Sequence, residues 1–439
     1  MVKAIERMNA LGINTPDILI PKPGTDLTKW SVVACDQYTS EPEYWERVEA
    51  FVGDAPSTLH LVYPEAYLDE DNPEKRIANI NSTMQNYLHH HLFTEYSENF
   101  FLLHRNTGQG PGRWGLIVAL DLEYYDYRID SKTPIRATEG TILSRIPPRK
   151  EIRKKAELEL PHILVLINDE RRSVIEPLIE RLDTLEQVYN TDLMENGGHI
   201  QAYRVAGDSL LQELASAFEA IFESLNPQNP LMFAMGDGNH SLATAKSCWE
   251  DLKGTLTKEE QATHPARYAM VELENIFDPG LVFTPIHRVL FNCSRTTFLE
   301  ELSKHCNSYT IEQADSIPAI ITAIENQEGL QRFGYVDSDG LKVISITHPV
   351  SSIPAGTLQA VIDELLEAET GIQVDYIHGT SVTKALGLKQ GNIGLFLPAI
   401  DKKSFFSTII ADGALPRKTF SLGDAQEKRF YMEARRITT

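Results

Sequence analysis

The residues best suited to chemistry lie between positions 235 and 246, which read Met-Gly-Asp-Gly-Asn-His-Ser-Leu-Ala-Thr-Ala-Lys. An apolar run at residues 231–235 leads into them. The pattern therefore predicts a strand that ends at a glycine-bracketed aspartate and is followed by a helix. Glycine permits a positive φ or a close backbone approach to a ligand, and free N–H groups at a helix start favour a phosphate. We predict a phosphate-binding loop made by Gly236, Gly238, Asn239, His240 and Ser241.

Two side chains of this loop could act directly in a reaction. Asp237 could bind Mg²⁺ or orient an acceptor hydroxyl, and His240 could donate a hydrogen bond or shuttle a proton. The segment is neither a Walker loop nor a nucleophile elbow, because it lacks both consensus patterns. An ordinary strand-to-helix turn, in which Asp and Asn are turn formers, is the alternative.

A basic segment follows residue 136. Residues 145–155 contain six basic residues and one acidic residue, within a chain of net charge −21. Arg149 and Arg153 are i, i+4 neighbours on one predicted helix face, so with Arg145 they could bind a phosphate or carboxylate. A solvated helix face paired with surplus acids is the alternative. Glu139, beside Gly140, is a candidate base or metal ligand, or a turn residue.

Further candidates lie at other predicted strand ends. Asp36 follows a short apolar strand and precedes a helix predicted at residues 41–51, so it is a second candidate base, or part of a capping loop. Cys35 has no assigned base, which favours packing over nucleophilic catalysis. His287 and Arg288 follow a predicted strand and are weaker candidates for substrate binding.

The elements that must position these residues indicate an α/β fold of two or more lobes, with mixed sheets and helices on their faces. Strands are expected at residues 163–167 and 231–235, helices at 173–189 and 209–225, and a hairpin around the glycine-rich residues 107–112. The sequence Asn-Pro-Gln-Asn-Pro at residues 226–230 suggests a boundary. We predict an N-terminal lobe, 1–226, and a C-terminal lobe, 227–439, that carries the Gly-Asp-Gly-Asn-His loop.

Composition narrows the function classes. The chain has 439 residues, with 41 Lys and Arg against 62 Asp and Glu. A net negative charge repels nucleic acid and anionic lipid, so we expect a small-molecule substrate. A homo-oligomer is possible. The four cysteines form no C-x-x-C pair, and the sequence shows neither a signal peptide nor an apolar stretch of membrane-spanning length. We expect a reduced, cytoplasmic protein.

Together these segments resemble the bacterial and archaeal family known as domain of unknown function 1015. The resemblance rests on residues 34–41, 136–149, 236–241, 285–288 and 415–418. The family commonly shows Asp-Gly-His-His-Arg at the central motif, where this chain has Asp-Gly-Asn-His-Ser. Asn239 thus replaces a His and Ser241 an Arg, so a role carried by that Arg does not transfer.

The Asp-Gly-His-His-Arg motif is similar, over a short stretch, to that of free serine kinases in the ParB/sulfiredoxin superfamily. This resemblance implies a ParB/sulfiredoxin-like site with ATP or ADP phosphates at the loop, Mg²⁺, and an acidic base from an earlier segment. The predicted function is nucleotide-dependent phosphoryl transfer to or from a small hydroxyl-bearing metabolite, with serine or phosphoserine as natural candidates. The alternatives are a phosphoserine-type phosphatase and a non-catalytic nucleotide- or metabolite-binding regulator.

Overall fold

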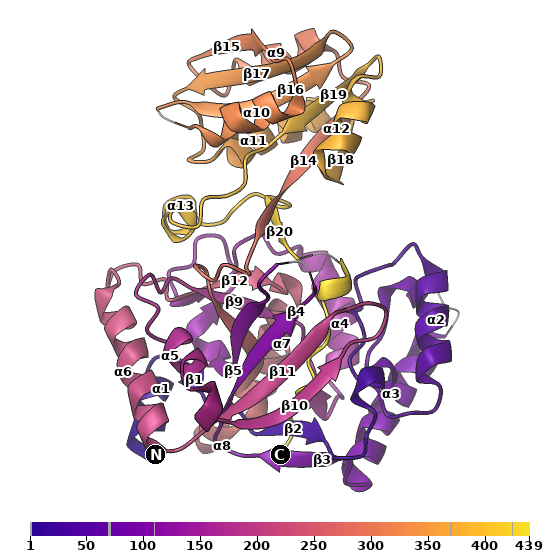
Figure 1. The fold of residues 1–439 in the computed structure, drawn as a ribbon, viewed down its shortest axis with the longest axis vertical. Helices are drawn as coiled ribbons and strands as arrows, with labels where there is room; N and C mark the ends of the chain where they lie inside the picture. Colours follow the sequence, from indigo (N-terminus) through magenta and orange to yellow (C-terminus); the bar gives the residue numbers. More distant parts are fainter. Residues whose placement is uncertain (1, 69–71, 109, 328, 369–370, 424) are drawn as a thin grey trace. The chain divides into compact units, whose positions relative to one another are not determined.

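The computed structural model describes residues 2–68, 72–108, 110–327, 329–368, 371–423 and 425–439. The chain is mixed α/β, as predicted, and divides into two compact units (Figure 1). Unit 1 comprises residues 1–282 and 423–439, and unit 2 comprises residues 283–422. The boundary predicted at residue 226 falls inside unit 1. Strand β12 (Phe233–Asp237) lies after residue 226, yet it belongs to the same sheet as strands β9 (Leu164–Ile167) and β7 (Ile135–Arg136), which lie before residue 226.

A ten-stranded mixed sheet forms the centre of unit 1. Its order is β10 (Glu186–Asp192), β11 (His199–Val205), β4 (Phe100–Asn106), β5 (Arg113–Asp121), β13 (Tyr268–Asn275), β9 (Leu164–Ile167), β12, β7 (Ile135–Arg136) and β6 (Tyr125–Asp126), with β1 (Ile13–Asn14) on β5. The antiparallel pair β4–β5 confirms the predicted hairpin. Strand β9 is parallel to β13 and antiparallel to β12, and all four of its residues are buried, as expected of a central strand.

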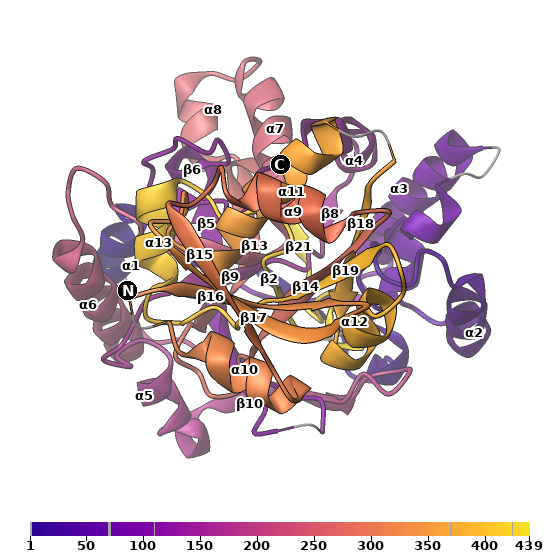
Figure 2. The same ribbon diagram turned by 90° about the horizontal axis from the view of Figure 1, so that it is seen from above.

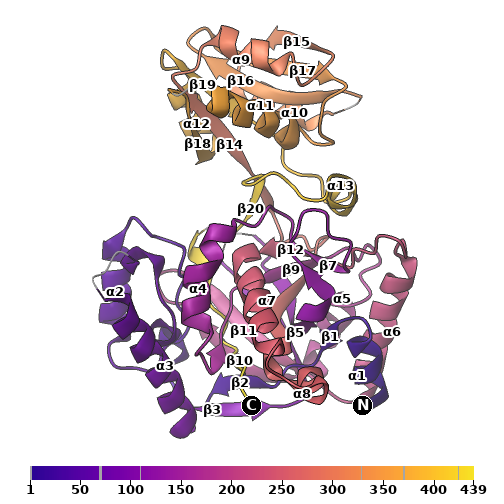
Figure 3. The same cartoon turned by 180° about the vertical axis from the view of Figure 1, so that it is seen from behind.

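Helices cover one face of this sheet. Alternate side chains of β4, such as Phe100 and Leu102, pack there against four helices: α1 (Val2–Asn9), α5 (Glu176–Ile179), α6 (Asp208–Ser224) and α7 (Asn239–Lys253). Figure 3 shows α7 across the sheet with α4 (Ile146–Arg153) alongside it. The short α8 (Lys258–Thr263) follows α7. The predicted helices at 209–225 and after residue 239 are thus confirmed.

The helix predicted at residues 173–189 is wrong over most of its length. Only α5 is α-helical, a short 3-10 helix spans Leu182–Thr184, and residues 186–192 form β10 instead. Pairing with β11 satisfies the backbone of this segment and buries Tyr189, so tertiary pairing overrides the local pattern.

The opposite face of the sheet is covered by chain from both ends of the sequence. Phe101 and Leu103 of β4 pack there against α3 (Pro73–His89) and the antiparallel pair of β2 (Ile18–Pro21) and β3 (Phe93–Tyr96). Helix α2 (Pro42–Val52) packs in a neighbouring cluster. Residues 428–437, here called the C-terminal segment, run across this face and end in β21 (Arg435–Arg436), which pairs with β8 (Leu158–Glu159).

Polar side chains lie buried beneath the C-terminal segment. The Tyr431 oxygen accepts hydrogen bonds of 3.1 Å from the backbone N–H groups of Ile163 and Glu272. Arg113 Nε lies 2.6 Å from Glu274 Oε1. Burial of a charge is costly unless a partner of opposite sign or hydrogen bonds offset it. This face of the sheet is therefore held together by polar contacts as well as by apolar packing.

Unit 2 is built on a seven-stranded sheet. Its order is β15 (Ser308–Gln313), β17 (Gly340–Thr347), β16 (Gln331–Asp337), β19 (Asn392–Phe396), β14 (Phe283–Phe291) and β18 (Gln373–His378), with β20 (Phe420–Leu422) on β14. Helices α9 (Arg295–Leu302) and α11 (Pro354–Ala368) cover one face, and α10 (Ile317–Glu325) covers the other (Figure 2). Helix α12 (Thr380–Gly387) packs on β19 and β14, and α13 (Phe405–Asp412) precedes β20. Within the described residues, no helix of either unit combines the length and apolar character needed to cross a bilayer.

The buried carboxyl of Glu433 generates a pH-dependent prediction. Burial raises its pKa to about 7, and the Tyr189 hydroxyl donates to it over 2.6 Å. A carboxyl with a raised folded-state pKa binds more protons folded than unfolded, so stability falls as pH rises from about 4.3 to about 7. Glu433→Gln keeps an acceptor for Tyr189 and cannot ionise. We expect it to raise the melting temperature by a few degrees at about pH 8 and to change it little at about pH 5.

Calorimetry at the two pH values tests this prediction. The matched control is Glu180→Gln, which alters an exposed carboxyl of unit 1. If Glu433→Gln and the control behave alike at both pH values, Glu433 does not titrate with a raised pKa.

Candidate functional site

A bulge at the end of β12 determines where Asp237 points. Met235 pairs with Val165 of β9, whereas Asp237 pairs with Leu164, so two steps along β12 match one step along β9. A bulge of this kind re-aims the side chain that follows it. Met235 packs in the helix-covered core, while Asp237 contacts groups on the C-terminal segment.

Gly238 makes the turn from β12 into α7. Its φ is +83°, and an added Cβ would lie 2.7 Å from the carbonyl oxygen of His162, so both its conformation and its surroundings require glycine. Helix α7 begins at the next residue, and no side chain of the described residues caps that start. Gly236 is buried and residues 237–241 are partly exposed. The predicted strand, turn and helix are confirmed, and the start of α7 is open to solvent.

A lysine and a histidine face the Asp237 carboxylate. Lys428 Nζ lies 2.9 Å and His162 Nε2 lies 3.6 Å from Asp237 Oδ2. The N–H of Gly238 donates to Oδ1 over 2.7 Å. Burial alone would raise the pKa of Asp237, but His162 and Lys428 outweigh that effect and hold the pKa well below its usual value. Asp237 is therefore ionised at neutral pH.

Lys428 joins the predicted acids into one cluster. Its side chain is only 18% exposed, and its backbone carbonyl accepts from Ala34 N–H, which places it beside the segment that carries Asp36. Burial alone would lower the pKa of Lys428, but the nearby carboxylates outweigh this and raise it. Those carboxylates belong to Asp237, Asp36 and Glu139. Asp237 contacts this ammonium group directly, and Asp36 and Glu139, from other parts of the sequence, act on it electrostatically.

The start of α7 also holds the loop that carries Glu139. Asn239 Oδ1 accepts from the backbone N–H of Thr138 over 3.2 Å, and His240 Nε2 accepts from the backbone N–H of Ile142 over 3.2 Å. The two contacts bracket Glu139. Asn239 and His240 therefore position a carboxylate of the site, and a direct contact with phosphate stays a prediction for both.

The basic segment approaches the same cluster through Glu65. Arg149 Nη2 donates to the Glu65 carboxylate, and the Glu65 N–H donates to the carbonyl of Cys35 over 2.7 Å. Burial raises the pKa of Glu65, while Arg149 and, more weakly, Arg145 oppose the shift. The Asp36 carboxylate adds to the upward shift of the Glu65 pKa. Burial also raises the pKa of the Cys35 thiol to about 12, in keeping with a packing role.

Three other predicted residues have structural partners. Arg153 Nη2 binds Glu159 Oε2 at 2.5 Å, in a buried ion pair beneath the C-terminal segment. His287 lies in unit 2, where its Nδ1 accepts from a backbone N–H and burial lowers its pKa to about 4. Arg288, also in unit 2, stacks over the Tyr376 ring at 5.2 Å. We leave these three out of the proposed site.

Sequence reasoning missed His162, Lys428 and Glu65. His162 lies two residues before the buried strand β9, so a polar residue next to a strand start was the available signal. Lys428 lies in a charged stretch, Gln-Glu-Lys-Arg at residues 426–429, with no pattern that distinguishes it from surface. Its role depends on burial against a sheet far from it in sequence.

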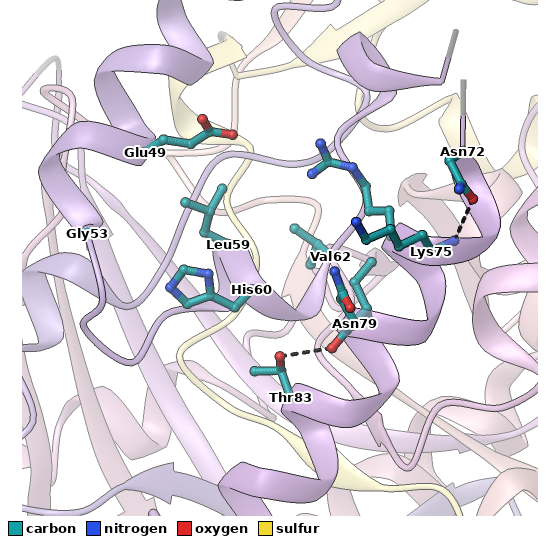
Figure 4. Close-up of a pocket in the computed structure, with 11 residues that line it drawn as sticks. Glu49, Gly53, Leu59, His60, Val62, Asn72, Lys75, Asn79 and Thr83 are labelled. Carbon is teal, nitrogen blue, oxygen red and sulfur yellow. Dashed lines mark hydrogen bonds between the residues drawn. The ribbon is translucent and has the colours of Figure 1, made fainter. Parts of the chain in front are cut away.

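A cavity of about 570 Å³ lies elsewhere in unit 1, where α3 faces residues 59–62 and the end of α2. Figure 4 shows Lys75, Asn79 and Thr83 of α3 facing Leu59 and His60 across it. None of the predicted site residues lines this cavity. Some of its polar residues have partners within α3, such as Thr83, which donates to the Asn79 carbonyl over 2.9 Å, whereas Glu49 and His60 contact Tyr67 and the Ala55 carbonyl. The cavity is therefore separate from the chemistry of the Asp237 cluster.

The Asp237–Lys428 pair predicts a stability effect. Asp237→Asn leaves the largely buried ammonium with fewer partners, and we expect a loss of about 1–2 kcal/mol of unfolding free energy, moderated by partial solvent exposure. Urea unfolding at neutral pH measures it. The control is Asp251→Asn, which removes an exposed partner of Lys150 and should cost about 0.5 kcal/mol or less. Equal losses in the two variants would show that the Asp237–Lys428 pair is as weak as a surface pair.

Comparison with solved structures gives distant likenesses. A conserved hypothetical protein from Pyrococcus furiosus is 11% identical, with a TM-score of 0.36 over 70% of this chain and 90% of its own. A free serine kinase in complex with AMP is 12% identical, with a TM-score of 0.37 over 70% and 87%. Truncated SbnI from Staphylococcus aureus is 9% identical, with a TM-score of 0.35 over 70% and 82%. Likenesses this distant do not determine the activity of the chain.

Sequence comparison is more decisive about the family. No curated protein matches the chain. The profile of one family matches residues 19–365, which span the cluster of Asp36, Glu139 and Asp237 and most of unit 2. The chain therefore belongs to the family described as protein of unknown function, DUF1015.

Proposed function

We propose that unit 1 binds a nucleotide phosphate beside Lys428 and transfers a phosphoryl group to or from a small hydroxyl-bearing metabolite. The observation that carries this proposal is the cluster at the start of α7. There a largely buried ammonium pairs with an ionised Asp237, beside the start of α7, and Asp36 and Glu139 act on the same ammonium electrostatically. Phosphoryl transfer needs mainly positioning and charge neutralisation. Lys428 supplies one positive charge, and Mg²⁺ held by the carboxylates would supply the rest.

The phosphate is bound by positive charge and N–H donors. Lys428 provides the charge, and the first turn of α7, with Gly238 before it, provides backbone donors and the positive end of the helix dipole. Asp237 acts as a positioning residue, because its carboxylate fixes the Lys428 ammonium at 2.9 Å. The overall charge of −21 makes such a local cation necessary for an anionic ligand.

The acceptor is activated by a carboxylate. In the forward direction the acceptor oxygen forms a bond to the terminal phosphorus, and the bond between that phosphorus and the bridging oxygen breaks. The base takes the hydroxyl proton. We assign the base to Asp36, because it is exposed and can reach a metabolite that enters from solvent.

The carboxylates of Asp237 and Glu139 are the candidate ligands for Mg²⁺ in this site. Both Asp237 oxygens have partners, Lys428 at Oδ2 and the Gly238 N–H at Oδ1. Glu139 is half-buried and close enough to Lys428 to raise its pKa. Carboxylate oxygens are ligands that Mg²⁺ prefers, and a bound Mg²⁺ would neutralise phosphate charge. Asp237 and Glu139 are the residues of this chain that would hold Mg²⁺ in the proposed site.

Arg149 and Arg145 fit the anionic part of the metabolite. Arg149 is paired with Glu65, and both side chains are about three-quarters buried. A guanidinium held in this way is pre-oriented for a carboxylate or phosphate. Serine and phosphoserine have the required hydroxyl or phosphate together with a carboxylate, and they are the first compounds to test.

A phosphorus NMR experiment separates the proposal from its alternatives. Purified protein is incubated with ATP or ADP, Mg²⁺, and serine or phosphoserine. A new phosphate ester, or loss of phosphoserine with gain of ATP, supports transfer. Release of inorganic phosphate from phosphoserine without nucleotide supports the phosphatase. Nucleotide binding without turnover supports the regulator.

Lys428 gives the sharpest test of the phosphate site. Lys428→Met removes the ammonium while keeping an unbranched side chain, and it should weaken ADP binding at least tenfold by calorimetric titration. Lys155→Met, which removes an exposed lysine just after α4, should bind ADP like the unaltered protein. Unchanged affinity in Lys428→Met would rule out this phosphate site.

Arg149 tests the metabolite site. Arg149→Gln should raise KM for the metabolite about tenfold to a hundredfold, because it removes a charge-assisted contact worth about 1.5–3 kcal/mol. The control on the same helix is Lys150→Gln, whose partner Asp251 is exposed; its kinetics should be nearly unchanged. If both variants leave KM unchanged, Arg149 serves only to balance Glu65.

A further inference from the structure

A second cluster of metal-binding side chains lies in unit 2. Glu301 is in the last turn of α9, His305 follows that helix, and Glu364 is on α11. The two helices contact each other on one face of the unit 2 sheet (Figure 2). One nitrogen of His305 and one oxygen from each carboxylate lie within 4.8 Å of one another.

Two of these side chains are buried with unsatisfied polar atoms. Glu301 is 6% exposed and His305 is 8% exposed. Neither Glu301 Oε1 nor His305 Nε2 makes a hydrogen bond to any residue that the structure describes. A buried polar atom without a partner costs about 1–3 kcal/mol, so these two atoms point into the cluster without the contact that would offset their burial.

The spacing is that of metal ligands and is long for hydrogen bonds. His305 Nε2 lies 3.4 Å from Glu301 Oε1 and 3.6 Å from Glu364 Oε1, whereas most N–H···O bonds are about 2.7–3.2 Å long. Two ligands about 2.1 Å from a tetrahedral Zn²⁺ are about 3.4 Å apart. The histidine-to-carboxylate distances therefore match two edges of one coordination tetrahedron.

Charge and ligand type select the kind of ion. Lys304 Nζ binds Oε2 of Glu301 at 2.7 Å, while Oε1 of the same carboxylate faces His305. A neutral imidazole with two carboxylates suits Zn²⁺ and similar transition metals, whereas Mg²⁺ and Ca²⁺ prefer oxygen ligands alone. The Glu364 side chain is 57% exposed, which leaves a side open to water.

We propose that Glu301, His305 and Glu364 bind one divalent transition-metal ion of the Zn²⁺ type, with water completing the coordination. The ion ties the end of α9 to α11. This site uses none of the residues assigned to phosphoryl transfer, so it stands independently of the proposed function.

Zinc titration of the full chain tests the proposal. Protein freed of metal with a chelator is titrated with Zn²⁺ against a chromophoric competitor, and with Co²⁺ followed by visible absorption. We expect one equivalent of Zn²⁺, a melting temperature that rises with Zn²⁺ concentration, and the Co²⁺ absorption of a four-coordinate site.

Two ligand variants and two controls locate the ion. His305→Gln and Glu364→Gln should each weaken Zn²⁺ binding by about 10- to 100-fold or more. Removing a residue that merely hydrogen-bonds to a metal ligand already costs that much. Glu364 is exposed, so Glu364→Gln should fold even if His305→Gln does not. The controls Glu300→Gln and His348→Asn, both at exposed positions of unit 2, should bind like the unaltered protein. Absence of binding, or equal binding by Glu364→Gln, overturns the proposal.

Discussion

The contact on which unit 1 depends is the passage of residues 428–437 across one face of its sheet. This C-terminal segment supplies Lys428 to Asp237, Tyr431 to two backbone N–H groups of the sheet, and Arg435 to Glu159. Each of these contacts adds a partner to a polar group on this face, beside those that the rest of unit 1 provides, such as Arg153 for Glu159. A buried charge without a partner destabilises a fold by several kcal/mol. The segment is therefore a structural part of the sheet face and also a source of site residues.

This arrangement explains why a strongly acidic chain can present a cation to an anionic ligand. Burial acts in opposite directions on the two partners, since it raises the pKa of Asp237 and lowers that of Lys428. For Asp237, His162 and Lys428 together outweigh burial, and for Lys428 the attraction of Asp237 and the neighbouring carboxylates does so. Both groups therefore stay charged across the neutral range. The carboxylates of Asp36 and Glu139 also attract the Lys428 ammonium and raise its pKa. A lone lysine at this position would be easier to deprotonate, and a lone aspartate would be easier to protonate.

The local part of the site could be predicted from sequence, and the long-range part could not. The strand, Gly-Asp-Gly turn and helix at residues 233–253 follow from short-range pattern, and Asp36, Glu139 and Asp237 were all identified at element ends. Lys428 and His162 have no local signal, because their significance comes from burial against distant strands. The helix predicted over residues 186–189 failed for the same reason: pairing with β11 determines the structure of that segment.

The domain boundary shows this limit most clearly. Unit 2 is inserted between β13 and the C-terminal segment, so unit 1 is discontinuous in sequence. A composition shift such as Asn-Pro-Gln-Asn-Pro marks a loop, but it cannot reveal that the chain returns to the same unit after residues 283–422. The insertion has a physical consequence. The Asp237 carboxylate lacks its lysine partner until residues 428–437 are in place, because this segment supplies Lys428. The Asp237 cluster is therefore assembled only when the two ends of unit 1 meet. Its ionised pair thus depends on the complete fold of that unit.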